Sequence, residues 1–230
     1  MSHFCVAVFT DGRKSIEELL APYDEGISVP TYIKETKFEA IKRIRQEIAD
    51  CVTSGPYGQW LSDKEEYEKG CKNEAHLNYL QNEFPKKLLW TDEDCYKDAI
   101  KYLEADELDE DGNILSNYNP KSKWDWYSVG GRWAGMLHAT SGTHGDGSAF
   151  NPNPKREGFY DSAKVADITF ADDFETFAVI TPDGEWHEKG KMGWFGITTD
   201  EKEGWKDAYK EAFLDNADPE WFLTIVDCHI

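Results

Sequence analysis

Both ends of the chain have the composition of β-strands, and this constrains the fold more than any other feature. Residues 4–10 (FCVAVFT) are β-branched or aromatic for the most part, and Asp11-Gly12 closes them with a turn signal. The last ten residues, WFLTIVDCHI, form a second strand-like run rich in β-branched side chains. We therefore expect one sheet that contains both the first and the last strand of the chain.

The segment between residues 31 and 110 has helical periodicity instead. From Thr36 onward, apolar residues recur three and four positions apart as far as Val52, which predicts an amphipathic helix. A second, more polar helix is expected over residues 63–82. A third should begin at Thr91, where TDED resembles an N-cap followed by acids that suit the positive end of a helix dipole.

After Asp111-Gly112 the pattern returns to strands and turns. WDWYSVGGRWAGMLHA predicts two strands around Gly130-Gly131, and residues 175–190 predict a hairpin whose turn is Pro-Asp-Gly. Residues 140–158 are rich in Gly, Ser, Asn and Pro, which predicts a long loop. A short strand is expected at 194–197 and a helix at about 200–216.

These patterns predict an α+β fold: an antiparallel sheet that includes the first and last strands, with an inserted, mostly helical segment. We expect a single domain over residues 1–230, in which a helical insertion at roughly 31–110 lies on a β core formed by 1–12 and 118–230. The length of 230 residues fits one large domain or two small ones.

The charge of the chain narrows the classes of partner. It has 45 acidic and 25 basic residues, a formal charge of −20. Such a field repels nucleic acid, so direct DNA or RNA binding is not expected, whereas a solvated acidic surface or mimicry of a polyanion is compatible with it. The 32 aromatic side chains (nine Trp, eleven Tyr, twelve Phe) argue against a disordered acidic chain.

Targeting signals and cysteine spacing suggest a reducing compartment. No run approaches the ~18 apolar residues of a membrane span, and the first residues lack the basic and apolar regions of a secretory signal. The five cysteines are scattered with no CxxC, which favours reduced thiols over a disulfide framework or a cysteine-based zinc site. We expect a cytoplasmic protein with no membrane association.

Four short motifs resemble a family of uncharacterised proteins encoded by bacteriophages and prophages. They are APYDE (21–25), YNPKSKWDWYSVGGRW (118–133), MGWFG (192–196) and VDCHI (226–230). The resemblance spans the chain and implies a viral or mobile-element origin, with the host cytoplasm as its location. It implies no mechanism and carries over no catalytic residue.

The most conspicuous candidate for a ligand site is the aromatic stretch around the glycine pair. If it is a strand, Trp124 and Trp126 share one face and Asp125 and Tyr127 the other. The aromatic residues Trp124, Trp126 and Tyr127 could form, together with Arg132 and Trp133, a pocket for a planar or phosphorylated ligand of nucleotide type. The competing interpretation is a tryptophan-rich core hairpin in which Arg132 pairs with Asp125. We expect Trp126 to be structural and Arg132 functional.

A second candidate lies at the two ends of the chain. If the terminal strands are antiparallel neighbours, alternation brings His3, Cys5, Asp227 and His229 to one face at one edge of the sheet. His3, Asp227 and His229 are therefore the candidates for a divalent metal site, although no cofactor is the leading expectation. His144 and Asp146, in the glycine-rich loop, are further candidates for a base or ligand.

Three functions remain open on the sequence alone. The leading one is a non-enzymatic acidic protein that binds and blocks a host factor, for counter-defence or as a nucleic-acid mimic. The second is capture of a nucleotide-type ligand through Trp124, Trp126, Tyr127, Arg132 and Trp133. The third is a metal-assisted hydrolase that uses the terminal histidines; the chain contains no GxGxxG, Walker or Gly-x-Ser-x-Gly motif that would indicate a standard enzyme.

Overall fold

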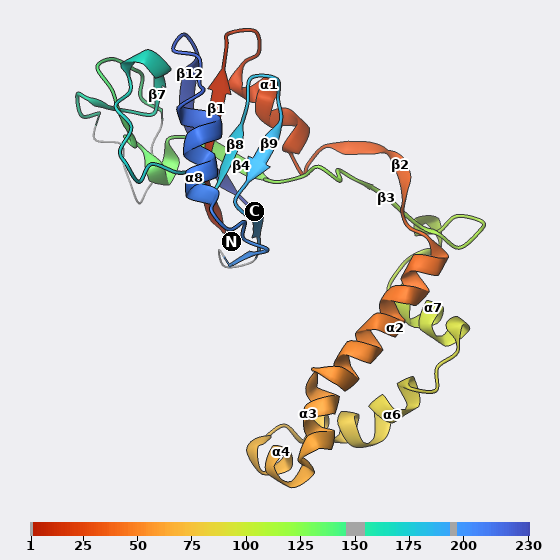
Figure 1. Ribbon diagram of the computed structural model, residues 1–230. Helices are drawn as coiled ribbons and strands as arrows, with labels where there is room; N and C mark the ends of the chain where they lie inside the picture. Colours follow the sequence, from red (N-terminus) through yellow and green to blue (C-terminus); the bar gives the residue numbers. More distant parts are fainter. Residues whose placement is uncertain (1, 146–154, 194–196) are drawn as a thin grey trace. The chain divides into compact units, whose positions relative to one another are not determined.

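The computed structural model describes residues 2–145, 155–193 and 197–230. The chain divides into two compact units, one made of Met1–Val29 with Tyr118–Ile230 and the other of Pro30–Asn117 (Figure 1). The first unit contains the sheet and the second consists mostly of helices, so the α+β class is confirmed. The expected helical insertion at 31–110 falls inside the second unit.

The sheet of the first unit is built around the first and last strands. Its order is β4-β12-β1-β8-β9, and β7 also pairs with β12. Its strands are β1 (His3–Thr10), β4 (Trp126–Val129), β7 (Ser162–Lys164), β8 (Ala178–Ile180), β9 (Trp186–Glu188) and β12 (Phe222–His229). The expected pairing of the two terminal strands is confirmed: β1 and β12 are antiparallel over eight residues each. β1 and β8 are parallel, so the sheet is mixed.

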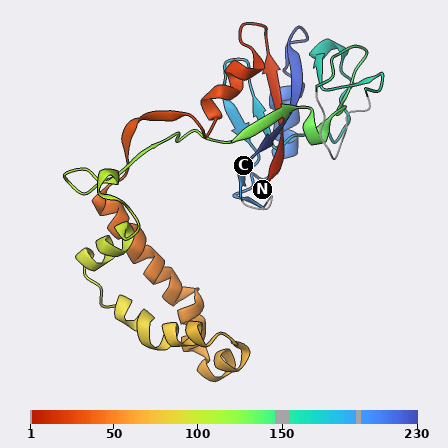
Figure 2. The same ribbon diagram turned by 180° about the vertical axis from the view of Figure 1, so that it is seen from behind.

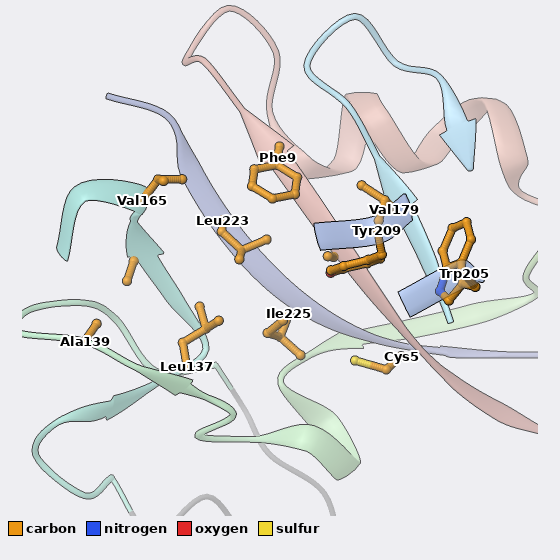
Figure 3. Close-up of a cluster of buried hydrophobic side chains, with 12 residues drawn as sticks. Cys5, Phe9, Leu137, Ala139, Val165, Val179, Trp205, Tyr209, Leu223 and Ile225 are labelled. Atoms are coloured by element: carbon orange, nitrogen blue, oxygen red, sulfur yellow. The ribbon is translucent and has the colours of Figure 1, made fainter. Parts of the chain in front are cut away.

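Both faces of β1 are covered, which explains its continuous apolar run. Cys5, Ala7 and Phe9 face a first cluster, in which Trp205 and Tyr209 of helix α8 (Trp205–Tyr209) pack onto the sheet (Figure 3). The alternate side chains of β1 face a second cluster with Leu19 and Leu20 of α1 (Ile16–Leu20). Helices α8 and α1 therefore lie on opposite faces, as the views in Figures 1 and 2 show.

Smaller elements complete the first unit. The predicted hairpin is confirmed as β8 and β9, which pair antiparallel. The π-helix Lys210–Leu214 follows α8 directly, so helical structure within the predicted 200–216 segment begins only at Trp205. The other elements are β5 (Leu137–His138), β6 (Phe159–Tyr160), β10 (Lys191–Met192), β11 (Thr198–Thr199) and the 3₁₀ helices Ala21–Tyr23, Gly131–Trp133 and Val165–Asp167. Of the strand expected at 194–197, residues 194–196 lie outside the described residues.

The two strands predicted around the glycine pair are β4 and β5, but they do not pair with each other as a hairpin. β4 ends at Val129 and pairs with β12, and the chain then enters the 3₁₀ helix Gly131–Trp133. The next strand, β5, pairs with β6 and not with β4. Both glycines have positive φ, +77° for Gly130 and +52° for Gly131, but they redirect the chain away from β4 rather than fold it back along that strand.

The second unit is built on a long helix, as predicted. The helix α2 (Lys37–Thr53) begins at a capping box of Thr36 and Glu39, and α7 (Asp92–Ile100) begins at the predicted N-cap Thr91. The single helix expected at 63–82 is wrong, because the chain breaks between Gly70 and Glu74. The other elements are α3 (Pro56–Ser62), α4 (Lys64–Gly70), α5 (Glu74–Asn78), the π-helix Tyr79–Glu83, α6 (Phe84–Lys87) and the 3₁₀ helix Ala105–Glu107.

Apolar packing holds the second unit together. The helices α2 and α7 are in contact, and their buried residues are Ala40, Ile44, Cys95 and Tyr96. A separate apolar cluster contains Tyr57, Trp60, Leu80 and Phe84. The strands β2 (Ser28–Glu35) and β3 (Ile114–Tyr118) pair with each other, and the chain passes between the two units within these strands. In the described part of the chain, no helix is long and apolar enough to cross a membrane.

Candidate functional site

Register and alternation bring the polar residues of the two terminal strands together. His3 pairs with His229 and Cys5 with Asp227, so all four side chains project from the same face of β1 and β12. This face carries the first apolar cluster further along the strands. The His3 Nδ1 lies 2.8 Å from Oδ1 of Asp227, within hydrogen-bonding distance. Because a carboxylate only accepts, the imidazole donates from Nδ1 in this contact.

Asp227 is a fully buried carboxylate with two different donors. Its Oδ1 accepts from His3, and its Oδ2 accepts from the backbone N–H of Arg132 at 2.8 Å. Burial is the main cause that raises the pKa of the neighbouring Cys5 and Cys228 thiols, and the Asp227 charge adds to it. These two cysteines therefore stay protonated and do not provide a thiolate nucleophile.

A second buried carboxylate, Asp161, packs against Gly130, just as Asp227 packs against Gly131. Its Oδ1 accepts from the Gly135 N–H and its Oδ2 from the Gly145 N–H, the latter at 2.6 Å. A Cβ placed on Gly130 would lie 2.7 Å from the Asp161 carboxyl carbon, and one on Gly131 would lie 2.3 Å from the Asp227 Cβ. The Gly-Gly pair is thus required because two buried carboxylates pack directly against the backbone.

A second imidazole–carboxylate pair lies beside the first. The His229 Nδ1 is 2.6 Å from Oδ1 of Asp125. The rings of His3 and His229 are 5.0 Å apart, and the Trp126 ring lies 6.0 Å from His3 and 6.2 Å from His229, all three edge to face. Two histidines oriented through Nδ1 and one indole therefore form an aromatic group at the end of the sheet.

The five residues predicted to bind a ligand do not converge. Trp124 is 6% exposed, packs in the second cluster and donates from Nε1 to the Leu20 carbonyl, and Tyr127 packs against that same cluster. Trp126 is 50% exposed and lies on the other face with His3. The prediction that Trp124 and Trp126 share a face is wrong, because β4 begins only at Trp126.

The remaining two residues of that set have different surroundings again. Trp133 packs against the first cluster, and the Arg132 side chain is exposed. Trp126 being half-exposed also departs from the expectation that it is a structural core residue. The buried tryptophan of the motif is Trp124.

Among the described residues, no group of three or more His, Cys, Asp or Glu side chains is arranged to hold a metal ion. His3 contacts Asp227, whereas His229 contacts Asp125. His144 stacks against Tyr160, with ring centroids 5.1 Å apart, and its buried Nδ1 has no partner among the described residues. Asp146 lies outside the described residues.

A cavity of about 500 Å³ opens beside the His229–Asp125 pair. Its wall includes Glu25, Tyr118, Asp125, Met192, His229 and Ile230. Each of the four sequence motifs contributes at least one of these residues, although the motifs are far apart in the chain. Hydrogen bonds explain why two of the motifs meet: the Asn119 side chain donates to the carbonyls of Pro22 and Asp24.

Sequence reasoning did not single out Glu25 and Tyr118 as site residues. The Tyr118 hydroxyl donates to Glu25 Oε2 at 3.1 Å across 93 positions of sequence. Neither position has a pattern that would identify it in advance, since a glutamate and a tyrosine next to turns are ordinary surface residues.

The second unit has a different feature, a concentrated acidic surface. Pro30–Asn117 contains 20 acidic and 12 basic residues, a charge of −8. Residues 92–111 alone contain ten acidic residues and two lysines, also −8, so the rest of the unit is balanced. Large apolar side chains are exposed at both ends of α7: Leu89 is 84% exposed and Tyr102 is 86% exposed.

Several acidic residues of this segment have no cationic partner in the described part of the chain. Asp92 pairs with Arg45, Glu93 with Lys97 and Asp98 with Lys101. Further along, no ion pair within the described residues involves Glu104, Asp106, Glu107, Glu110 or Asp111, all of which are exposed. The acidic segment is therefore defined as residues 92–111, with Leu89 and Tyr102 as its apolar neighbours.

Comparisons with known proteins give no relative: no family model, curated protein or solved structure matches the chain.

Proposed function

We propose that the chain is an acidic interaction protein that uses its helical unit to bind and block a basic surface of a partner protein. The observation that carries this proposal is the acidic segment, residues 92–111, which contains ten acidic residues and only two lysines. A charge concentrated in one segment favours a specific encounter with an opposite charge, whereas a dispersed charge mainly confers solubility.

The exposed apolar side chains beside the acidic segment support a protein partner. Leu89 and Tyr102 would each bury a large apolar surface on binding, and aromatic side chains surrounded by polar groups are typical anchors of protein interfaces. The acidic residues then provide orientation and fast association, while the apolar anchors provide affinity.

The chemistry of the partner follows from the same charges. A surface that accepts a dense row of carboxylates is rich in arginine and lysine, as are the sites that bind nucleic acid through phosphates. In this proposal the acidic segment occupies such a site in place of nucleic acid. The resemblance to phage and prophage proteins makes a host protein the expected partner, with counter-defence as the role.

The test uses the tagged full-length chain to capture proteins from a bacterial lysate at low salt, with two matched variants. The first replaces Glu104, Asp106 and Glu110 by Gln, Asn and Gln; the second replaces Glu65, Glu66 and Glu74, which are exposed on α4 and α5, by Gln. Both variants change the charge of the same unit by +3.

The proposal expects a discrete protein that binds the parent chain and the α4/α5 variant, and binds the acidic-segment variant much more weakly. Circular dichroism should show the same helix content in all three chains. Equal capture by both variants, or no captured protein that differs from the tag control, contradicts the proposal.

A further inference from the structure

Two carboxylates line the cavity beside His229, and each uses only one of its two oxygens in a side-chain hydrogen bond. Asp125 uses Oδ1 for His229, and Glu25 uses Oε2 for the Tyr118 hydroxyl. The second oxygen of each, Oδ2 of Asp125 and Oε1 of Glu25, has no partner within the described residues. Both side chains line the cavity, so these oxygens are available as acceptors there.

The rest of the wall suits the body of an organic molecule. Met192 and Ile230 contribute apolar surface, and Tyr118 contributes a phenol ring. No lysine or arginine is among the described residues that line the cavity. The first unit contains 25 acidic and 13 basic residues, a charge of −12, and a net negative unit attracts cations.

We propose that this cavity binds a small organic cation, an alkyl amine or alkyl guanidine. The charged head lies between Asp125 and Glu25, where charge-assisted hydrogen bonds to both carboxylates are available, and the face of the Tyr118 ring offers a cation–π contact. The alkyl chain lies against Met192 and Ile230. A volume of about 500 Å³ lies within the range of small-molecule sites.

The imidazole of His229 has a positioning part in this arrangement. Its Nδ1 contacts one oxygen of Asp125 and leaves the other oxygen for the ligand. The carboxylate is therefore oriented before the ligand arrives, which reduces the conformational entropy lost on binding. The cavity belongs to the first unit, whereas the acidic segment belongs to the second.

Titration calorimetry of the full-length chain tests the proposal with four probes of similar length. Agmatine and 1,4-diaminobutane contain the cationic heads; 1,4-butanediol is neutral and succinate is anionic. We expect saturable binding of at least one cation and none of the diol or succinate. A blocked lysine-containing tripeptide distinguishes a free amine from a basic side chain of a protein, since only the second source makes the peptide the tighter ligand.

Two variants locate the site. Glu25→Gln and Asp125→Asn should each weaken cation binding about tenfold or more, because each removes a charge-assisted hydrogen bond. Glu203→Gln, an exposed carboxylate outside the cavity wall, should bind like the parent and controls for net charge. Thermal melts confirm that each variant is folded. Equal binding of the diol and the cations, absence of binding by both cations, or parental affinity in folded Glu25→Gln overturns the proposal.

Discussion

His3 and Asp227 lie 224 positions apart in sequence, and yet the His3 Nδ1 is 2.8 Å from the Asp227 Oδ1. The contact joins the start of β1 to the end of β12, the two strands at the centre of the sheet. Asp227 has no exposed surface, and its other oxygen accepts from the Arg132 backbone. A buried carboxylate that loses one donor retains the cost of desolvation, so this contact stabilises the junction of the chain ends.

Asp227→Ala should destabilise the first unit by about 2–4 kcal/mol, because it leaves the His3 imidazole and the Arg132 N–H without their buried acceptor. Asp125→Ala removes the equivalent acceptor of His229, but that carboxylate is partly exposed and water replaces it at lower cost. Urea denaturation followed by tryptophan fluorescence compares the two. Equal loss of stability in both variants would show that burial of Asp227 does not matter.

Gly131→Ala should be far more damaging than Gly12→Ala. Both positions have positive φ, which costs an alanine roughly 1–2 kcal/mol. At Gly12 a Cβ meets nothing within 4 Å, whereas at Gly131 it would lie 2.3 Å from the Asp227 Cβ. The melting temperatures of the two variants therefore separate backbone strain from the steric clash. If Gly131→Ala melts with or above Gly12→Ala, the close packing of Asp227 on the glycine pair is incorrect.

Trp124→Ala should cost about 3–5 kcal/mol, the range for a buried aromatic side chain. Trp124 is 6% exposed and its Nε1 donates to the Leu20 carbonyl, while Trp126 is 50% exposed. Trp126→Ala should therefore lose much less stability than Trp124→Ala. Chemical denaturation of the two variants gives the comparison, and a larger loss for Trp126 would reverse the assignment of buried and exposed rings.

The cysteines should differ in reactivity according to burial. Burial raises the pKa of Cys5 and Cys228, so at pH 8.5 these thiols hold a smaller thiolate fraction than ordinary cysteines and are also inaccessible. Iodoacetamide labelling of the native chain, read by peptide mass spectrometry, should modify Cys51 and Cys71 first, since both are partly exposed. Labelling in urea should modify all five at similar rates.

The same shifts have a consequence for stability at high pH. The pKa of each buried thiol is higher in the folded chain than in the unfolded one, so the unfolded state loses protons first as the pH rises. Their contribution to stability is complete below the ordinary thiol pKa near 9 and is lost as the pH rises toward the folded value.

In the labelling experiment, native Cys5 or Cys228 that reacts with iodoacetamide as fast as Cys71 would contradict the burial of the chain ends.

The pairing of the terminal strands was predictable because each has a strong strand composition and period-two alternation fixes which side chains share a face. The break between Gly70 and Glu74 was not, because the polar 63–82 segment has only a thin apolar line to signal where a helix ends. The role of the glycine pair could not be predicted from the sequence either, because it depends on Asp161, between β6 and β7, and on Asp227 of β12, which are both remote in sequence. The cavity wall combines four remote segments, and no local pattern anticipates such convergence.

The most direct measurement of the proposed function is the stability of the captured complex against salt and a competing polyanion. If the acidic segment occupies a nucleic-acid site on its partner, the partner should be released when salt rises from about 50 to 500 mM, since screening weakens exposed charge pairs. Duplex DNA added at low salt should also displace the chain in proportion to its concentration. A complex that persists through both treatments contradicts the account.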